Sequence, residues 1–179
     1  MLTIEPYDDA WPAMFDAEAA RLRSTLGDLA LCIEHVGSTS VPGLPAKPVI
    51  DIQVSVASLE PSASYIEKLA LLGYRHEPLG EFDLIYPFFV KPADWPSTHH
   101  VHLCVAGNEQ EARHLAFRDY LRRAPVVASE YAVLKRALAA ANHGETLESR
   151  ERYSLAKSDF IERVLRQAAA ESKPGAPRA

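Results

Sequence analysis

The spacing of hydrophobic residues changes along the chain from helical, to alternating, and back to helical in the last third. Near the N-terminus, Trp11, Phe15, Ala19 and Leu22 recur every three or four residues, which predicts a helix over residues 8–26. Alternation in the middle of the chain is typical of strands with one buried face. The order of patterns therefore indicates an N-terminal helix, a mainly β middle and a helical C-terminal third.

The clearest strand pattern covers residues 49–56. The even positions of this segment are all isoleucine or valine, whereas the odd positions include Asp51, Gln53 and Ser55. Side chains alternate between the two faces of a strand, so the even positions are expected to pack in the core. The opposite face of the strand carries the polar side chains of Asp51, Gln53 and Ser55.

The remaining elements follow from the same patterns and from the glycines, prolines and capping residues at their ends. We expect strands at 31–36, 83–91 and 99–106, a structured loop at 39–48, and helices at 61–72, 109–123, 125–142 and 146–170. Asn108 is expected to cap the helix at 109–123, with Glu111 completing a capping box. These elements predict an α+β domain over residues 1–170, with helices packed on a mixed β-sheet, and a disordered tail over 171–179.

Length and composition restrict the class of protein. A chain of 179 residues fits one domain and can bury a core without disulfides. Cys32 and Cys104 each lie in an apolar run, which indicates buried thiols in a reducing compartment. No apolar run is long enough to span a membrane, and the N-terminus lacks the features of a secretion signal. We therefore expect a cytoplasmic protein with no membrane partner.

The charge is unevenly distributed. The formal net charge of -5 argues against a general nucleic-acid binder. Residues 1–106 hold 14 acidic and 6 basic residues, whereas residues 107–179 hold 10 acidic and 13 basic residues. This division fits a metal site that faces an anion-binding wall, and it also fits helices with ordinary solvated basic faces.

The first candidate site combines Gly37 and Ser38 with Asp51. A strand that ends in Gly-Ser can bring its backbone and a hydroxyl close to phosphate oxygens. A strand aspartate can hold Mg²⁺, which bridges polyphosphate oxygens. Lys47 lies in the proline-rich loop between the two strands and is a candidate phosphate contact. The alternative interpretation is a simple turn followed by an aspartate and an exposed loop lysine.

The same residues lie within a longer stretch that resembles the GrpB family. The resemblance covers residues 4–168 and rests on several ordered segments: residues 6–11, 35–54, 99–103, 117–122, 131–135 and 153–161. Members of this family resemble the nucleotidyltransferase superfamily in fold, and some occur fused to dephospho-coenzyme A kinase. The resemblance therefore implies a nucleotidyltransferase-like mixed sheet.

The superfamily motif maps only partly onto this chain. Gly37 and Ser38 match its Gly-Ser element, and Asp51 matches its first carboxylate. Gln53 occupies the position of the second carboxylate, and the strand expected to supply a third offers His100 and His102 instead. This change disfavours a site for two Mg²⁺ ions.

Asp51, His100 and His102 are the expected catalytic and metal-binding residues. A carboxylate with two imidazoles suits a single Zn²⁺ or Mn²⁺ ion better than Mg²⁺, although all three ions are candidates. Without a metal, the histidines can contact phosphate or act as a general base. A pair of hydrogen-bonded core histidines is the alternative interpretation.

The expected substrate-binding residues come from the loop, the strand and the C-terminal helices. They are Gly37, Ser38, Lys47, Gln53, Arg118, Lys135, Tyr153 and Lys157. The last four lie in segments that match the family, and Arg and Lys side chains suit phosphate groups. The surface alternative is that these basic residues are solvated.

These observations favour an enzyme that binds a nucleotide or another phosphorylated small molecule and transfers a nucleotidyl or phosphoryl group with a divalent metal. The missing carboxylates favour a non-catalytic ligand-binding module linked to coenzyme A metabolism. A metal-dependent hydrolase built on Asp51, His100 and His102 is the third hypothesis.

Overall fold

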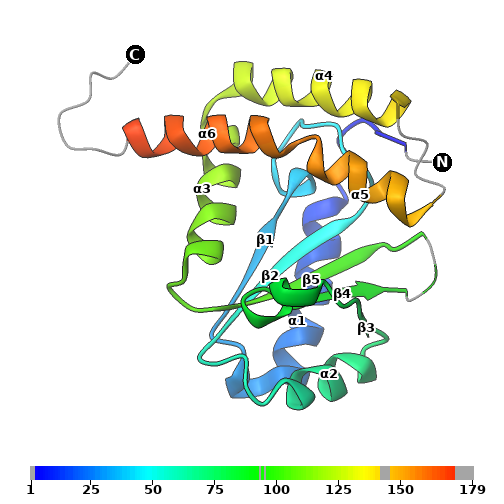
Figure 1. The fold of residues 1–179 in the computed structure, drawn as a ribbon. Helices are drawn as coiled ribbons and strands as arrows, with labels where there is room; N and C mark the ends of the chain where they lie inside the picture. The colour runs from blue at the N-terminus through cyan, green and yellow to red at the C-terminus, as the bar shows by residue number, and fades with distance from the viewer. Residues whose placement is uncertain (1–2, 93, 95, 142–145, 172–179) are drawn as a thin grey trace.

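A five-stranded mixed β-sheet forms the centre of the computed structural model (Figure 1). The structure describes residues 3–92, 94, 96–141 and 146–171. The strands are β1 (Cys32–Val36), β2 (Ile50–Val56), β3 (Arg75–His76), β4 (Phe88–Lys91) and β5 (His99–Val105), in the spatial order β1-β2-β5-β4-β3. The central strands β2 and β5 are parallel, and each of the other neighbouring pairs is antiparallel. The predicted α+β class with a mixed sheet is confirmed.

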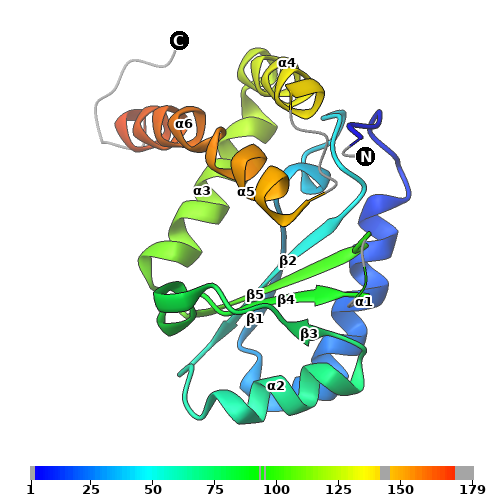
Figure 2. The ribbon, with the colours of Figure 1, turned by 45° about the vertical axis from the view of Figure 1, so that its right-hand side comes forward.

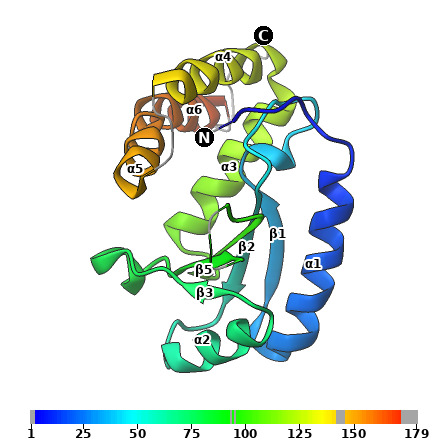
Figure 3. The same ribbon diagram turned by 90° about the vertical axis from the view of Figure 1, so that its right-hand side faces the viewer.

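The main hydrophobic core lies between one face of the sheet and two helices. These are α1 (Trp11–Leu26) and α2 (Ser62–Leu71), and α1 lies on the face of β1 and β2 opposite to α3 (Figure 3). The even positions of β2 are fully buried and pack in this core, as their alternation predicts. Leu22, Leu69 and Leu103 extend the same cluster from the helices and from β5. The odd positions of β2 consequently face the other side.

Helices make up the described part of the C-terminal third, and Figure 2 shows the last three of them at the end of the sheet away from α2, whereas the first runs beside the sheet. They are α3 (Glu109–Arg123), α4 (Pro125–Ala141), α5 (Leu147–Leu155) and α6 (Ser158–Glu171). The loop after β1 is ordered by this group, because Val41 and Leu44 pack against Leu121 and Tyr131. The second half of the chain therefore holds the loop that contains Ser38 and Lys47.

The N-terminus of α3 begins at Asn108, as predicted. The Asn108 Oδ1 accepts a hydrogen bond from the backbone N–H of Glu111 at 2.9 Å. The Glu111 carboxylate does not close the predicted reciprocal box. It accepts instead from the backbone N–H of Gly107 at 2.6 Å and from the Ser55 hydroxyl on β2. Glu111 thereby ties the first turn of α3 to the sheet.

Two predicted elements are wrong in extent. The strand expected at 83–91 is limited to β4, because residues 80–84 form a short 3-10 helix, η3 (Gly80–Leu84). The Asp83 carboxylate favours this turn by accepting from the backbone N–H of Leu79 at 2.9 Å. The two-residue strand β3 was not predicted, since so short a segment has no readable alternation.

The helix expected at 146–170 is divided into α5 and α6. The break occurs at Ala156 and Lys157, where the backbone N–H groups still bond to carbonyls of Arg152 and Ser154. Neither glycine nor proline marks this point, so the residue pattern could not reveal it. Glu171 ends α6, and residues 172–179 of the expected tail lie outside the described part of the chain. None of the described helices has the length and apolar character needed to cross a membrane.

Candidate functional site

Asp51, His100 and His102 meet on the face of the sheet opposite the main core. In the parallel pairing of β2 with β5, Asp51 lies beside His100 and Gln53 lies beside His102. Asp51 Oδ1 is 3.2 Å from His100 Nδ1 and 3.7 Å from His102 Nε2. One ligand atom from each of the three residues lies within 4.8 Å of the others. The predicted trio is thus brought together by strand register.

The loop after β1 approaches this cluster through Gly37. Its φ of 68° and ψ of -169° fall in a region that is essentially restricted to glycine. A Cβ atom built at position 37 would lie 2.9 Å from both Cβ and Cγ of Asp51. The absence of a side chain at Gly37 therefore makes room for the Asp51 carboxylate, which accounts for the Gly-Ser signal in the sequence.

The electrostatics of the cluster favour a carboxylate beside neutral imidazole. Burial acts to raise the pKa of Asp51, but hydrogen bonds and charge from His100 and His102 outweigh it and hold that pKa well below its ordinary value. Burial lowers the pKa of His100, against the opposing effect of Asp51. At neutral pH the site therefore offers an ionised carboxylate and an uncharged His100 ring.

These donors fit a divalent metal ion. Metal ligands must be a deprotonated carboxylate and neutral imidazoles, which is the state that the pKa directions give for Asp51 and His100. Their side chains are 29% and 16% exposed, and that of His102 is 19% exposed, so the cluster opens to solvent. One carboxylate with two imidazoles suits Zn²⁺ or Mn²⁺, as expected from the sequence.

Two aromatic rings fix the orientation of His102. The ring centroid of Tyr86 lies 4.9 Å from that of His102 at an interplanar angle of 17°, and the ring of Phe88 lies 4.8 Å away at 27°. The buried Nδ1 of His102 has no hydrogen-bond partner among the described residues. The stacked rings therefore hold His102 in place, with its Nε2 on the side of Asp51.

Lys135 is a buried cation from α4. Only 2% of the residue is exposed, and its Nζ donates a hydrogen bond to the Pro45 carbonyl at 2.5 Å while lying 4.8 Å from the Tyr131 ring centroid. Burial first, and then the charges of Lys157 and Arg136, lower the pKa of Lys135 to about 7. Asp51 acts in the opposite direction on this lysine.

Lys157 lies at the break between α5 and α6. Its Nζ is 4.4 Å from the Tyr153 ring centroid. Burial lowers the pKa of Lys157 to about 8, with Asp51 raising it and Lys47 lowering it further. The charge of Lys47 also lowers the pKa of His100. The charges of Lys47 and Lys157 and those of the Asp51 cluster therefore influence one another.

Two tyrosines complete this region. Burial raises the pKa of Tyr153 to about 12, and the charge of Asp51 raises it as well. Burial also raises the pKa of Tyr131, whereas a hydrogen bond with the Ser38 side chain lowers it. Ser38 is therefore linked to Tyr131 of α4, at the side of the site that holds Lys135. Both tyrosines remain uncharged at neutral pH.

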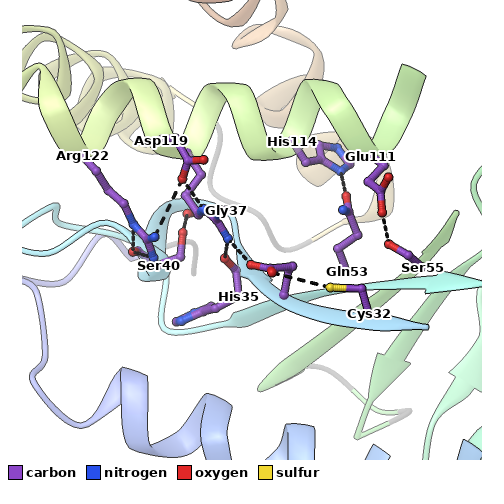
Figure 4. Close-up of polar contacts among 12 residues, drawn as sticks. Cys32, His35, Gly37, Ser40, Gln53, Ser55, Glu111, His114, Asp119 and Arg122 are labelled. Atoms are coloured by element: carbon purple, nitrogen blue, oxygen red, sulfur yellow. Dashed lines mark hydrogen bonds and ion pairs between the residues drawn. The ribbon is translucent and has the colours of Figure 1, made fainter. Parts of the chain in front are cut away.

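Two of the predicted substrate-binding residues have protein partners between α3 and the sheet, and Figure 4 shows one of them, Gln53, with His114. Arg118 donates to Glu34 at 2.6 Å, to Asp119 at 2.7 Å and to the His35 carbonyl at 3.0 Å. Gln53 is fully buried, and its Oε1 accepts a hydrogen bond from His114 Nδ1 at 2.9 Å. The structure thus places these two side chains between α3 and the sheet, where both are bonded to other protein groups.

Comparison with known proteins identifies the family. The family model described as GrpB protein matches residues 1–167. This chain belongs to the GrpB family. A crystal structure of the conserved protein GrpB from Enterococcus faecalis is similar, with a TM-score of 0.81 and 37% identity, over 94% of this chain and 98% of that one.

Two relatives of the GrpB-family chain are longer than the matching region. UPF0157 protein YqkA of Bacillus subtilis is 39% identical over 87% of this chain and 43% of its own length. Dephospho-CoA kinase of Mycobacterium leprae is 30% identical over 83% of this chain and 43% of its own length. A crystal structure of the Cid1 poly(U) polymerase has a TM-score of 0.46 and 16% identity, over 86% of this chain and 49% of that one.

Residue patterns missed several contributors to the site of this GrpB-family protein. Neither Tyr86 nor Tyr131 was predicted as a site residue, although Tyr131 begins a segment that resembles the family. His114 had no readable partner, because Gln53 lies 61 residues away in sequence. The odd positions of β2 were a usable signal, since polar residues on a buried strand require partners from the covering helix.

Proposed function

We propose that this GrpB-family protein binds a phosphorylated small molecule of the nucleotide class together with a divalent metal ion. One observation carries the proposal. The Asp51–His100–His102 cluster can hold a metal. The charge of Lys47 affects the pKa of His100, and the charge of Asp51 affects the pKa of Lys135 and of Lys157. A metal ion beside several lysines suits a polyanion such as a polyphosphate.

Asp51, His100 and His102 would hold the metal. Such an ion supplies charge neutralisation at phosphoryl oxygens and polarises the phosphorus that is attacked. Lys157 is half-buried, the charge of Asp51 raises its pKa, and its ammonium would face the oxygens of a bound phosphate. Gly37 leaves space at the Asp51 carboxylate. The next residue, Ser38, would offer its hydroxyl and backbone N–H to the phosphate.

The reaction we propose is metal-assisted nucleotidyl or phosphoryl transfer. Lys47 and Lys157 would stabilise the negative charge that develops on the transferred group. Gln53 supports only a single-metal version of this chemistry, because its amide is held by His114 and carries no charge. The ligands are therefore limited to one carboxylate and two imidazoles.

A non-catalytic ligand-binding module is the second candidate. It is supported by the same Gln53, and by the match of this chain to under half of a protein named dephospho-CoA kinase. In that case the protein would bind its ligand without turning it over, in connection with coenzyme A metabolism. Under a third hypothesis, the three-ligand site would serve a metal-dependent hydrolase.

The experiment is a thermal-shift screen of the purified chain with Mg²⁺, Mn²⁺ and Zn²⁺, each with and without the four ribonucleoside triphosphates. We expect a stabilisation that requires both a metal and a nucleotide, because ligands that bind only the folded state raise its melting temperature. Asp51→Asn should remove the metal-dependent stabilisation. A flat response to every combination would contradict the proposal.

Turnover assays separate the candidates. Release of pyrophosphate or transfer of labelled phosphate by the wild type, abolished by Asp51→Asn, supports transfer. Ligand binding that survives Asp51→Asn without any turnover supports the binding module. Metal-stimulated release of inorganic phosphate from a simple phosphomonoester supports the hydrolase.

A further inference from the structure

A pocket of about 210 Å³ lies between α3 and α6, next to the Asp51 cluster. We propose that this pocket receives a planar heteroaromatic group, such as a nucleobase, at the end of the ligand opposite its phosphates. This inference rests on the function proposed above and names the part of the ligand that the metal and the lysines do not contact. Figure 1 shows the two helices that form its walls.

The lining of the pocket suits a flat ring with a polar edge. Phe117 from α3 and Ile161 and Leu165 from α6 supply apolar surface. Gln110 and Glu162 supply hydrogen-bonding groups on the same two helices. Small-molecule pockets typically combine mostly apolar walls with a few placed polar groups, which fix the orientation of the ligand.

The size of the pocket restricts its occupant to a fragment. At about 210 Å³, it is smaller than the pockets of roughly 300–1,000 Å³ that hold a whole drug-sized molecule. A single ring or two fused rings fit such a volume, and the remainder of a larger ligand must lie outside. The neighbouring site provides a place for that remainder.

Both walls of the pocket continue into the Asp51 site. On α3, His114 lines the pocket, and its ring centroid lies 6.0 Å from that of His102. On α6, Ser158 lines the pocket and directly follows Lys157. A ligand with a ring in the pocket can therefore extend its charged end toward the metal ligands and Lys157.

The polar groups of the pocket offer both donors and acceptors. Arg113 and Glu162 form an ion pair that joins α3 to α6 at the pocket. The Gln110 side chain has no hydrogen-bond partner among the described residues, so its amide can donate and accept. His114 is half-buried and uncharged at neutral pH, because partial burial lowers its pKa to about 4. Nucleobase edges present adjacent donors and acceptors of this kind.

Calorimetric titrations of the full chain with Mn²⁺ test the inference. The probes are inorganic tripolyphosphate, the four ribonucleoside triphosphates and the four nucleosides. Ser158→Trp fills the pocket, and Ser62→Trp is its matched control, since both serines are exposed and begin a helix. Gln110→Ala is a second pocket variant that keeps a helix-favouring residue in α3.

We expect at least one nucleoside triphosphate to bind the wild type roughly tenfold more tightly than tripolyphosphate does, which corresponds to about 1.4 kcal/mol. Ser158→Trp should remove this advantage and leave tripolyphosphate binding unchanged, whereas Ser62→Trp should change neither. Gln110→Ala should reduce the advantage in the same direction.

Three outcomes overturn one or both claims. If tripolyphosphate binds as tightly as every nucleotide, or if Ser158→Trp weakens both alike, the pocket inference is wrong and the proposed function stands. If tripolyphosphate fails to bind but a nucleoside binds in a manner that Ser158→Trp abolishes, the proposed function is wrong and the pocket inference stands. If no probe binds, both are wrong.

Discussion

Gly37 lies against Asp51 so closely that a methyl group at position 37 would come within 2.9 Å of the Asp51 Cβ and Cγ. Gly37→Ala should therefore displace the carboxylate and abolish Mn²⁺ binding, and the backbone strain should cost about 1–3 kcal/mol of unfolding free energy. Calorimetry and urea denaturation measure the two effects.

Gly43→Ala is the matched control for this prediction. Gly43 also has a positive φ of 76°, but no atom lies within 4 Å of the position of its Cβ. We expect it to lose stability and to retain Mn²⁺ binding. Equal loss of metal binding in both variants would contradict a local effect at Asp51.

Lys157→Met should affect stability and ligand binding in opposite directions. Burial disfavours the ammonium of Lys157, as its lowered pKa of about 8 shows, so an uncharged side chain of similar length should raise the melting temperature. The same change should weaken tripolyphosphate binding roughly tenfold through loss of one phosphate contact. Lys68→Met, on α2, should leave binding unchanged. Unaltered tripolyphosphate affinity in Lys157→Met would remove this lysine from the site.

Gln53→Glu should not create a second metal ligand. The side chain at this position is held by His114 on α3, and a buried carboxylate there should raise the pKa of His114 from its value of about 4. We expect a loss of about 1–3 kcal/mol at neutral pH and an Mn²⁺ affinity within about twofold of the wild type. Histidine NMR titration and calorimetry check these outcomes. Tighter Mn²⁺ binding would instead mean that residue 53 reaches the metal.

Acid should destabilise the protein partly through His35. Its Nε2–H donates to the Thr39 hydroxyl at 3.0 Å, because that hydroxyl already donates to the Val49 carbonyl. Burial lowers the pKa of His35 from 6.5 to about 4, so between these pH values the unfolded chain binds a proton that the folded chain does not. The free energy of unfolding should therefore fall with decreasing pH in this window, by up to about 3 kcal/mol.

His35→Gln tests the assignment. Its amide can still donate to Thr39 but does not titrate, so the dependence of stability on pH should be shallower than in the wild type. His114 has a pKa lowered in the same direction and should leave part of the slope. Urea denaturation at pH 7, 6, 5 and 4.5 makes the comparison. Parallel curves for wild type and variant would show that His35 is not responsible.

The sequence predicted the sheet and the Asp51–His100–His102 cluster because both rest on short-range signals. Alternation identified β2 and the buried face of its isoleucines, and the i, i+2 spacing placed His100 and His102 on one side of β5. Gly37 was recognisable because a Gly-Ser strand end allows close backbone approach to a ligand, although in the structure the group that approaches it is the Asp51 carboxylate. What joined these segments was the family resemblance, since alternation alone does not specify which strands pair.

The contacts of α3 could not be predicted in the same way. Arg118 has the sequence features of an anion-binding residue, and only the fold reveals that Glu34, 84 residues away, is its partner. The break at Lys157 has no local cause in the residues around it, and it nevertheless decides where that ammonium lies. Features that depend on packing between distant segments are determined by tertiary structure and leave no periodic trace.

The parallel pairing of β2 with β5 also has a kinetic consequence. Asp51 and His100 are 49 residues apart along the chain. Parallel strands such as β2 and β5 cannot be joined by a tight turn and need a long crossover connection. Contacts of such long range close late and slowly during folding, because the loop entropy is lost before the contact is gained. Binding of a spectroscopically visible ion such as Co²⁺ at this pair would therefore report the last stage of folding, after the antiparallel hairpins have formed.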